Sequence, residues 1–175
     1  MITLISGTNR KNSLTQQFSS IYFQMLKRKM PDSLFFDLCH LPDSLLNLDP
    51  DFYKNRPQEL IAIQSEFFIP ADKFIFIIPE YNGSYPGILK LLIDVLDPKE
   101  SFKNKKAALT GIATGRAGNL RGMDHLTAVL NHMNVTVMPY QLPVSKVQHE
   151  FNGTDQFAEG TQNAVERQIN DFIAF

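Results

Sequence analysis

The sequence predicts an α/β fold in which one parallel sheet lies between two layers of helices. Strand-like and helix-like segments alternate along the chain, in the order β-α-β-α-β-α-β-α-β-α. This alternation is typical of a parallel sheet with helices on both faces. Residues 74–78 form a continuous apolar run, which indicates a strand buried on both sides. Polar, glycine-containing loops follow three of the strand patterns, which predicts that one edge of the sheet carries the chemistry.

The first two strands flank an amphipathic helix. Residues 1–5 predict a short strand. A helix follows, with Ser13 as a suitable N-cap and Pro31 at its end. Residues 34–36 predict the second strand. The apolar positions of the helix recur at three- and four-residue spacing and give one buried stripe: Leu14, Phe18, Ile21, Tyr22, Met25 and Leu26.

The middle of the chain predicts a long loop, two helices and the central strand. Residues 38–56 read as a loop, and loops of this length are often functional. Helical periodicity covers 57–69, and a proline at its start suits the first turn of a helix. The apolar strand 74–78 comes next, and a third amphipathic helix covers 86–96.

The last third of the chain repeats the alternation twice. Residues 106–113 predict the fourth strand and 119–133 the fourth helix. Residues 135–138 predict the fifth strand, which Pro139 ends, and 155–174 predict the final helix.

Five such strands fit the flavodoxin-like order 2-1-3-4-5, since right-handed crossovers restrict the possible topologies. We therefore expect a flavodoxin-like three-layer sandwich. The chain has no repeats, low-complexity tracts or internal linker, so we expect one domain over residues 1–175. In this order the loops after strands one, three and four should converge on one crevice, where such sheets bind ligands.

Composition excludes several classes of protein. The net charge of −1 argues against a nucleic-acid surface. Cys39 is the only cysteine, so a disulfide framework is excluded. No apolar run approaches the roughly 18 residues of a membrane span, and the apolar start is too short for a signal peptide. We therefore expect a cytoplasmic protein without membrane partners.

The first loop, residues 6–15, has the composition of an anion site. It ends where a helix starts, and free N–H groups and the helix dipole favour a phosphate there. Thr8, Ser13 and Thr15 offer neutral hydroxyl donors, and Arg10 offers a charged one. The loop is neither a P-loop nor a Gly-x-Gly-x-x-Gly fingerprint. The alternative is a helix start that is simply capped by Ser13.

The second loop, residues 79–88, suits a flat ligand. Backbone N–H groups near Asn82 and Gly83 can face the polar edge of a ring, and Tyr81 can lie beside it. The alternative is a tight turn, because Asn-Gly is a strong turn dipeptide and Pro86 suits a helix start. The two interpretations are compatible, since a binding loop must also turn.

The third loop, residues 114–122, is rich in glycine, which allows a ligand to approach the backbone closely. Arg116 is a candidate for contact with a ring or a nucleotide phosphate. Arg121 has the same potential, although an arginine at such a position is more often a solvated helix charge. The alternative for the whole loop is an ordinary strand-to-helix turn.

These three loops together resemble the NAD(P)H-dependent FMN reductase family, which shares the flavodoxin-like fold. The family motif Gly-Ser-x-Arg-x-x-Ser-x-Asn corresponds to residues 7–15, with threonine at Thr8 and Thr15. The motif Pro-Glu-Tyr-Asn-Gly-Ser-x-Pro-Gly-x-Leu-Lys is matched throughout by residues 79–90. A glycine-rich loop before a Leu-Arg helix corresponds to residues 114–121.

The resemblance spans about residues 1–139 and implies FMN as cofactor, with NADPH or NADH as co-substrate. It implies that the first loop holds the phosphate and that the other two loops contact the isoalloxazine ring. The cofactor-binding residues implied are Thr8, Arg10, Ser13, Leu14, Thr15, Pro79, Glu80, Tyr81, Asn82, Gly83, Thr114, Gly115 and Arg116.

The implied activity is transfer of hydride from nicotinamide to flavin and then to a small acceptor, such as a flavin, quinone or azo compound. Because the flavin performs this chemistry, no catalytic side chain is required. The four histidines lack a metal-ligand spacing, so we expect no metal site. Two alternatives are an electron-transfer flavoprotein without a nicotinamide step and a binding module without turnover. The near-neutral charge argues against an electron carrier.

The resemblance also implies a homodimer or dimer of dimers in which two subunits complete the flavin sites. The apolar residues of the 38–56 loop are candidates for part of that contact, although the same pattern suits a packed loop. They are Leu45, Leu46, Leu48, Phe52 and Tyr53.

Overall fold

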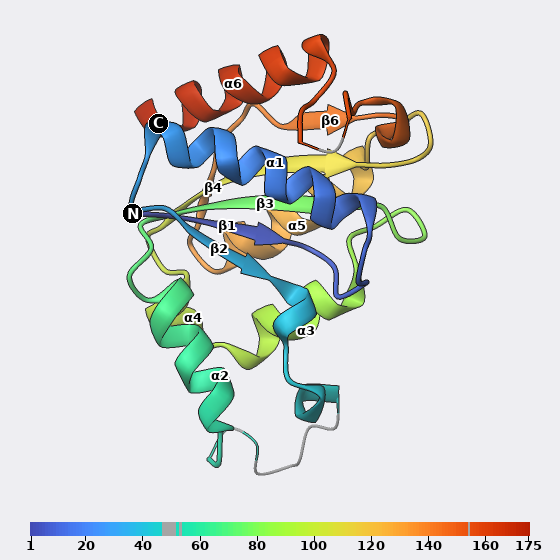
Figure 1. The fold of residues 1–175 in the computed structure, drawn as a ribbon. Coiled ribbons are helices and arrows are strands. Elements are labelled where there is room, and N and C mark those ends of the chain that lie inside the picture. Colours follow the sequence, from blue (N-terminus) through green and yellow to red (C-terminus); the bar gives the residue numbers. More distant parts are fainter. Residues whose placement is uncertain (47–51, 53, 154) are drawn as a thin grey trace.

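One parallel sheet runs through the centre of the computed structural model, which describes residues 1–46, 52, 54–153 and 155–175 (Figure 1). The strands run in the order β2-β1-β3-β4-β5, and β6 also pairs with β4. This order confirms the predicted fold. The strands are β1 (Ile2–Ser6), β2 (Leu34–Asp37), β3 (Lys73–Pro79), β4 (Lys106–Ile112), β5 (Thr136–Val137) and β6 (Leu142–Val144).

The edge beyond β4 is shared by two short strands, where the sequence predicts a single strand over 135–138. β5 pairs only with the start of β4, and β6 pairs with its end, from Thr110 to Ile112. Pro139 explains the interruption, because proline has no N–H group for the ladder. The chain rejoins the same edge after four residues that belong to no strand.

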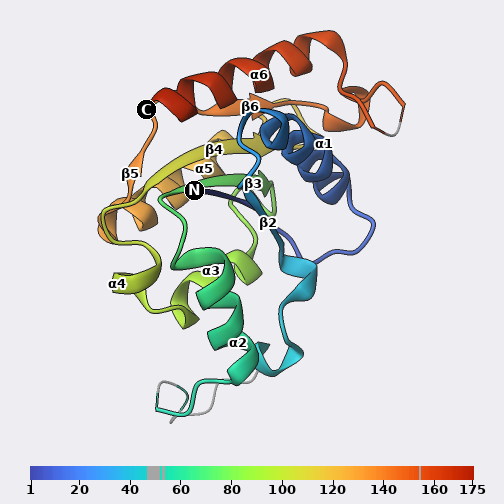
Figure 2. The same ribbon diagram turned by 60° about the vertical axis from the view of Figure 1, so that its left-hand side comes forward.

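Helices cover both faces of the sheet. Figure 2 shows α1 and α6 on one side and α2, α3 and α4 on the other. The apolar side chains of α1 and α6 pack in one core cluster, and those of α2, α3 and α5 pack in a second cluster. The helices are α1 (Leu14–Lys29), α2 (Gln58–Ile63), α3 (Gly87–Val95), α4 (Pro98–Ser101), α5 (Leu120–His132) and α6 (Glu159–Ala174).

Two boundaries differ from the prediction. The final helix begins at Glu159 rather than at residue 155. The segment predicted as one helix over 57–69 is α-helical in α2 and continues as a π-helical turn, η3 (Gln64–Phe68). The predicted helical length is thus right, although its second half is wound more widely. The short helix α4 is absent from the prediction.

The described part of the 38–56 loop is packed. It contains two 3₁₀ turns, η1 (Leu38–His40) and η2 (Asp43–Leu46). Leu45 and Phe52 are buried. Tyr53 and Leu48 lie outside the described residues, as does the side chain of Leu46. Within one chain, the described positions therefore favour a packed loop.

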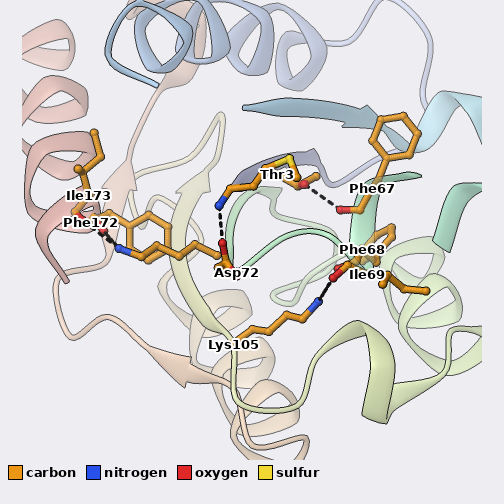
Figure 3. Close-up of polar contacts among 10 residues, drawn as sticks. Thr3, Phe67, Phe68, Ile69, Asp72, Lys105, Phe172 and Ile173 are labelled. Carbon is orange, nitrogen blue, oxygen red and sulfur yellow. Dashed lines mark hydrogen bonds and ion pairs between the residues drawn. The ribbon is translucent and has the colours of Figure 1, made fainter. Parts of the chain in front are cut away.

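The amino ends of the strands carry a set of lysines that bind carbonyl groups (Figure 3). Lys73 Nζ donates to the carbonyls of Phe172 and Ile173, at 3.0 and 2.9 Å. Lys105 Nζ donates to the carbonyls of Phe68 and Ile69, at 2.5 and 3.0 Å. A lysine at a helix C-terminus satisfies open carbonyls and complements the helix dipole. These lysines therefore cap α6 and η3.

The first residue joins the same region. The terminal ammonium group of Met1 donates to the carboxylate of Asp72, and this contact lowers the pKa of Asp72. Partial burial lowers the pKa of Lys73 and of Lys105, which is the opposite direction to the effect of the nearby Asp72. At this edge the charged groups therefore have partners within the chain.

Among the residues that the structure describes, no helix is both long and apolar enough to cross a membrane.

Candidate functional site

The loops after β1, β3 and β4 meet at the carboxyl ends of the strands and surround a cavity of about 380 Å³. Ligand pockets usually occupy roughly 300–1,000 Å³, so this size is sufficient for a small ligand. Nine of the predicted residues line the cavity: Arg10, Ser13, Leu14, Thr15, Pro79, Glu80, Tyr81, Asn82 and Thr114.

Four predicted residues lie outside the lining. Thr8 is buried beneath it, with 1% of its surface exposed. Gly83 lies near Arg121, since a Cβ atom built on it would be 3.2 Å from a guanidinium nitrogen of that residue. Gly115 and Arg116 are exposed on the rim formed by the third loop. The structure therefore brings all three predicted loops together, but not every residue of each loop faces the cavity.

The first loop ends in a capped helix with open donors. Ser13 is the N-cap of α1, and its hydroxyl accepts a hydrogen bond of 3.2 Å from the N–H group of Gln16. Among the described residues, the N–H groups of Leu14 and Thr15 have no hydrogen-bond acceptor. The first N–H groups of a helix lack intrahelical partners, and they bind anions well. The structure therefore shows the Ser13 cap and leaves N–H groups at the helix start that an anion could bind.

The loop can take this path because Gly7 lies against β3. Its N–H group donates to the carbonyl oxygen of Ile77 at 2.9 Å. A Cβ atom at this position would lie 2.6 Å from the same oxygen. Any larger residue must therefore push the loop away from the sheet.

The second loop is a tight two-residue turn. Tyr81 and Ser84 exchange backbone hydrogen bonds of 2.9 and 3.1 Å. Asn82 and Gly83 between them have φ angles of 52° and 75°, as a type I′ turn requires. Their left-handed backbone explains the Asn-Gly dipeptide. Ser84 Oγ lies 2.9 Å from Nδ1 of His125, which ties the turn to α5.

The third loop is held by a residue that the sequence analysis did not single out. Asn119 is 1% exposed and has a left-handed backbone with φ of 60°. Its Nδ2 donates to the carbonyl of Ile78 at 3.0 Å, where β3 runs into the second loop. The position was predicted only as the start of a helix. An Asn within a Gly-Asn pair is a turn signal, but its partner across the sheet cannot be found from sequence alone.

A fourth segment, residues 145–147, was also missed. Ser145 Oγ donates to the carbonyl of Arg116 at 2.8 Å, and the N–H group of Lys146 donates to the carbonyl of Gly115 at 2.9 Å. Val147 contributes to the cavity wall. This segment follows β6, which the prediction also lacked, and it carries no motif.

The first two loops are joined by side chains. The hydroxyl groups of Thr8 and Tyr81 are 2.6 Å apart. The guanidinium of Arg10 lies 4.3 Å from the centre of the Tyr81 ring, within cation–π distance. Arg10, on the first loop, therefore contacts the second loop through Tyr81.

Cys39 lies beside this arrangement but is poorly suited to act as a nucleophile. Its Sγ is 3.8 Å from the carbonyl oxygen of Thr8. Partial burial, reinforced by the carboxylate of Asp37, raises the pKa of the Cys39 thiol to about 11. The thiol is therefore protonated near neutral pH and is a weak nucleophile.

Other chemistry finds little support within the described residues. No group of three or more His, Cys, Asp or Glu side chains is arranged to hold a metal ion among them. A larger cavity of about 710 Å³ lies between α3 and α5, away from the three loops. Its polar lining consists of three lysines with Asp94, His132 and Asn134, whereas the smaller cavity combines a helix start with backbone donors.

The donors around the smaller cavity suit a phosphate attached to a flat polar ring. The lining includes the residues of the helix start, Ser13, Leu14 and Thr15, together with the cationic Arg10. It also includes the turn after Glu80 and the exposed Thr114. FMN has this combination of groups, so the residues present fit it.

Comparison with known proteins decides the family. Residues 1–149 match the sequence pattern of the family described as NADPH-dependent FMN reductase. The chain belongs to this family. The resemblance inferred from the three motifs is thus confirmed, and it extends past the third loop to the 145–147 segment.

Curated relatives of the reductase have related activities. An NAD(P)H-dependent FMN reductase of Pseudomonas aeruginosa is 33% identical over 100 residues, which cover 56% of this chain and 47% of that protein. The alignment thus spans about half the length of that relative. A 2-hydroxy-1,4-benzoquinone reductase of a Burkholderia species is 24% identical over 175 residues, covering 98% of this chain and 91% of the relative.

Solved structures agree on the fold. The flavoenzyme NAD(P)H:(acceptor) oxidoreductase FerB from Paracoccus denitrificans aligns with a TM-score of 0.80 at 22% identity. That alignment covers 99% of this chain and 94% of the other. An archaeal flavodoxin also aligns, with a TM-score of 0.60 at 12% identity over 99% and 97% of the two chains. At these identities the likeness concerns the fold.

Proposed function

We propose that this reductase binds FMN in the three-loop cavity and uses NADPH or NADH to reduce a small acceptor. The observation that carries the proposal is the convergence of an open helix N-terminus, Arg10 and the 81–84 turn on one cavity. Bound FMN supplies the hydride and electron chemistry, and the protein supplies binding, orientation and electrostatics. No acid, base or nucleophile of this chain is assigned to the reaction.

Each loop has a proposed task. The N–H groups of Leu14 and Thr15, with the hydroxyl of Ser13 and the guanidinium of Arg10, bind the phosphate. Backbone groups from Glu80 to Gly83 and from Thr114 to Arg116 contact the ring. Oriented N–H donors at its polar edge would stabilise negative charge that develops there during reduction.

A quinone is the acceptor class that we favour. One relative that aligns along nearly the whole chain is named a 2-hydroxy-1,4-benzoquinone reductase. Others are named FMN-dependent NADPH-azoreductases, at 28% identity over 144 residues for the protein from Staphylococcus saprophyticus. Quinone and azo compounds are both flat acceptors that can follow nicotinamide on the exposed ring face.

The proposal extends to assembly and location. We expect a homodimer or dimer of dimers, whose mass light scattering would report. We also expect the reductase to work in the cytoplasm, because the reaction consumes reduced nicotinamide. Residues 1–175 are expected to act as one domain.

Anaerobic reduction tests the proposed function. FMN-loaded protein should lose its visible flavin absorbance when NADPH or NADH is added, and benzoquinone should restore it. Free FMN at the same concentration is the control for direct reduction. If FMN binds but neither nucleotide bleaches it, the electron-carrier alternative replaces the reductase.

A further inference from the structure

Tyr81 lies on the loop expected to contact the flavin ring. Its hydroxyl oxygen, however, faces the first loop, residues 6–15, which we call the phosphate loop. Its hydroxyl oxygen is 2.6 Å from Thr8 Oγ1. This is a short hydrogen bond between two neutral hydroxyls, and it links positions 73 residues apart in sequence. The tyrosine ring is only partly buried, whereas Thr8 is almost completely buried.

The hydroxyl of Thr8 already has hydrogen-bond partners within the chain. In addition to Tyr81, it accepts a hydrogen bond of 3.3 Å from the backbone N–H group of Arg10. With two protein partners and 1% exposure, Thr8 is poorly placed to donate to a ligand phosphate. Its contacts instead fix the backbone from which the Arg10 side chain projects.

Tyr81 also contacts the side chain of Arg10 directly, in addition to its link to the Arg10 backbone through Thr8. The guanidinium lies 4.3 Å from the centre of the tyrosine ring, and among the described residues it has no carboxylate or carbonyl partner. A cation held over an aromatic face keeps its charge and its N–H donors available. Holding a flexible side chain in place before binding reduces the entropy lost on binding.

We propose that Tyr81 is a positioning residue for the phosphate loop, and that its hydroxyl increases affinity for the phosphate group of FMN through Thr8 and Arg10. The effect on the ring portion of the ligand is then small. This assignment rests on the proposed function, because it requires that FMN occupies the three-loop cavity.

Riboflavin has the same ring as FMN but no phosphate. Comparing the affinities for the two ligands therefore separates an effect of Tyr81 on phosphate binding from an effect on ring binding. Tyr81→Phe removes the hydroxyl and keeps the aromatic ring. Loss of one neutral hydrogen bond should weaken FMN binding by roughly three- to tenfold. Riboflavin affinity should stay within about twofold of wild type, because the lost bond concerns the phosphate loop. Both affinities are measured by quenching of flavin fluorescence.

Thr8→Val tests the same bond from the other side. The change keeps the branched shape and removes the hydroxyl, so it should produce a similar selective loss of FMN affinity. The double variant should bind FMN about as well as the weaker single variant, because both changes break one contact. Tyr85→Phe is the matched control, since Tyr85 is on the same loop but does not line the cavity. It should change neither affinity.

Thermal unfolding of each variant, followed by circular dichroism, identifies folded protein before the titrations. Equal losses for FMN and riboflavin in folded Tyr81→Phe would overturn the assignment, because Tyr81 would then act on the ring. Unchanged affinity for FMN would overturn it as well. If wild-type protein fails to bind FMN, the proposed function itself fails, and that result is distinct from a change confined to the variants.

Discussion

Charged and polar groups are satisfied differently at the two ends of the strands, which we call the amino edge and the carboxyl edge of the sheet. At the amino edge, Lys73 and Lys105 donate to carbonyl groups at the ends of helical segments. At the carboxyl edge, the N–H groups of Leu14 and Thr15 have no hydrogen-bond acceptor among the described residues. The guanidinium of Arg10 at this edge lies over the Tyr81 ring and has no carboxylate partner within the described part of the chain.

From this difference we infer that the amino edge contributes mainly to the free energy of unfolding, and that the carboxyl edge contributes mainly to ligand affinity. A satisfied cation at the amino edge stabilises the folded chain but has little capacity left for a ligand. An open donor at the carboxyl edge gains a partner only when an anion arrives, so it contributes to affinity instead. We therefore expect substitutions at the two edges to separate FMN affinity from the free energy of unfolding.

The largest effect is expected from Arg10→Ala at the carboxyl edge. Loss of a charge-assisted hydrogen bond to phosphate should weaken FMN binding by roughly 10- to 100-fold. The free energy of unfolding without FMN should change little, because Arg10 is exposed. Flavin fluorescence titration measures the affinity. Lys11→Ala, an exposed cation that does not line the cavity, is the matched control; an equal loss there would point to general charge attraction.

The converse is expected from Lys73→Met at the amino edge. This change keeps an apolar stem and leaves the carbonyls of Phe172 and Ile173 without their donor. The protein should lose about 1 kcal/mol of unfolding free energy, measured by urea denaturation, while FMN affinity stays at the wild-type value. Lys103→Met, at an exposed position, should cost less. A weaker affinity for FMN in folded Lys73→Met would contradict the separation.

A smaller effect at the amino edge depends on pH. The folded-state pKa of Asp72 lies below its ordinary value of 3.8, so its contact with the terminal ammonium stabilises the fold above that value. This contribution disappears as the pH falls through the lowered pKa. Asp72→Asn should therefore be slightly less stable than wild type near pH 7, and the gap should close in acid. The difference is small because Asp72 is exposed; a gap that widens in acid would contradict it.

The smallest effect is expected at Cys39, which lies beside Thr8 of the first loop but outside the cavity lining. Cys39→Ser should leave FMN affinity and NADPH oxidation within about twofold of wild type, since no role in binding is assigned to a protonated thiol. Because the thiol pKa is raised to about 11, its alkylation by iodoacetamide should be slow at pH 8 and should accelerate up to that value. Fast alkylation at pH 8 would show that the thiol is more acidic.

Sequence patterns predicted the sheet order and the three loops because their causes are local. The apolar run of β3 and the stripes of the helices report burial directly. The Asn82-Gly83 pair reports left-handed backbone. Such signals depend on a few neighbouring residues, so they can be read without knowing the rest of the fold.

The missed features depend on contacts between distant segments. β6 is a three-residue edge strand with a proline at its centre, and its place is defined only by β4. Asn119 was passed over because its partner, the carbonyl of Ile78, lies 41 residues earlier. Thr8 was predicted to face the phosphate, and only the position of Tyr81 shows that its hydroxyl is engaged within the chain.

Amide hydrogen exchange with and without FMN tests most directly whether the carboxyl edge is the binding edge. The predicted result is slower exchange on FMN addition in residues 13–16, 80–84 and 113–117, with unchanged exchange in residues 72–74 and 104–107 at the amino edge. Protection confined to the groove between α3 and α5, or to the amino edge, would contradict the account.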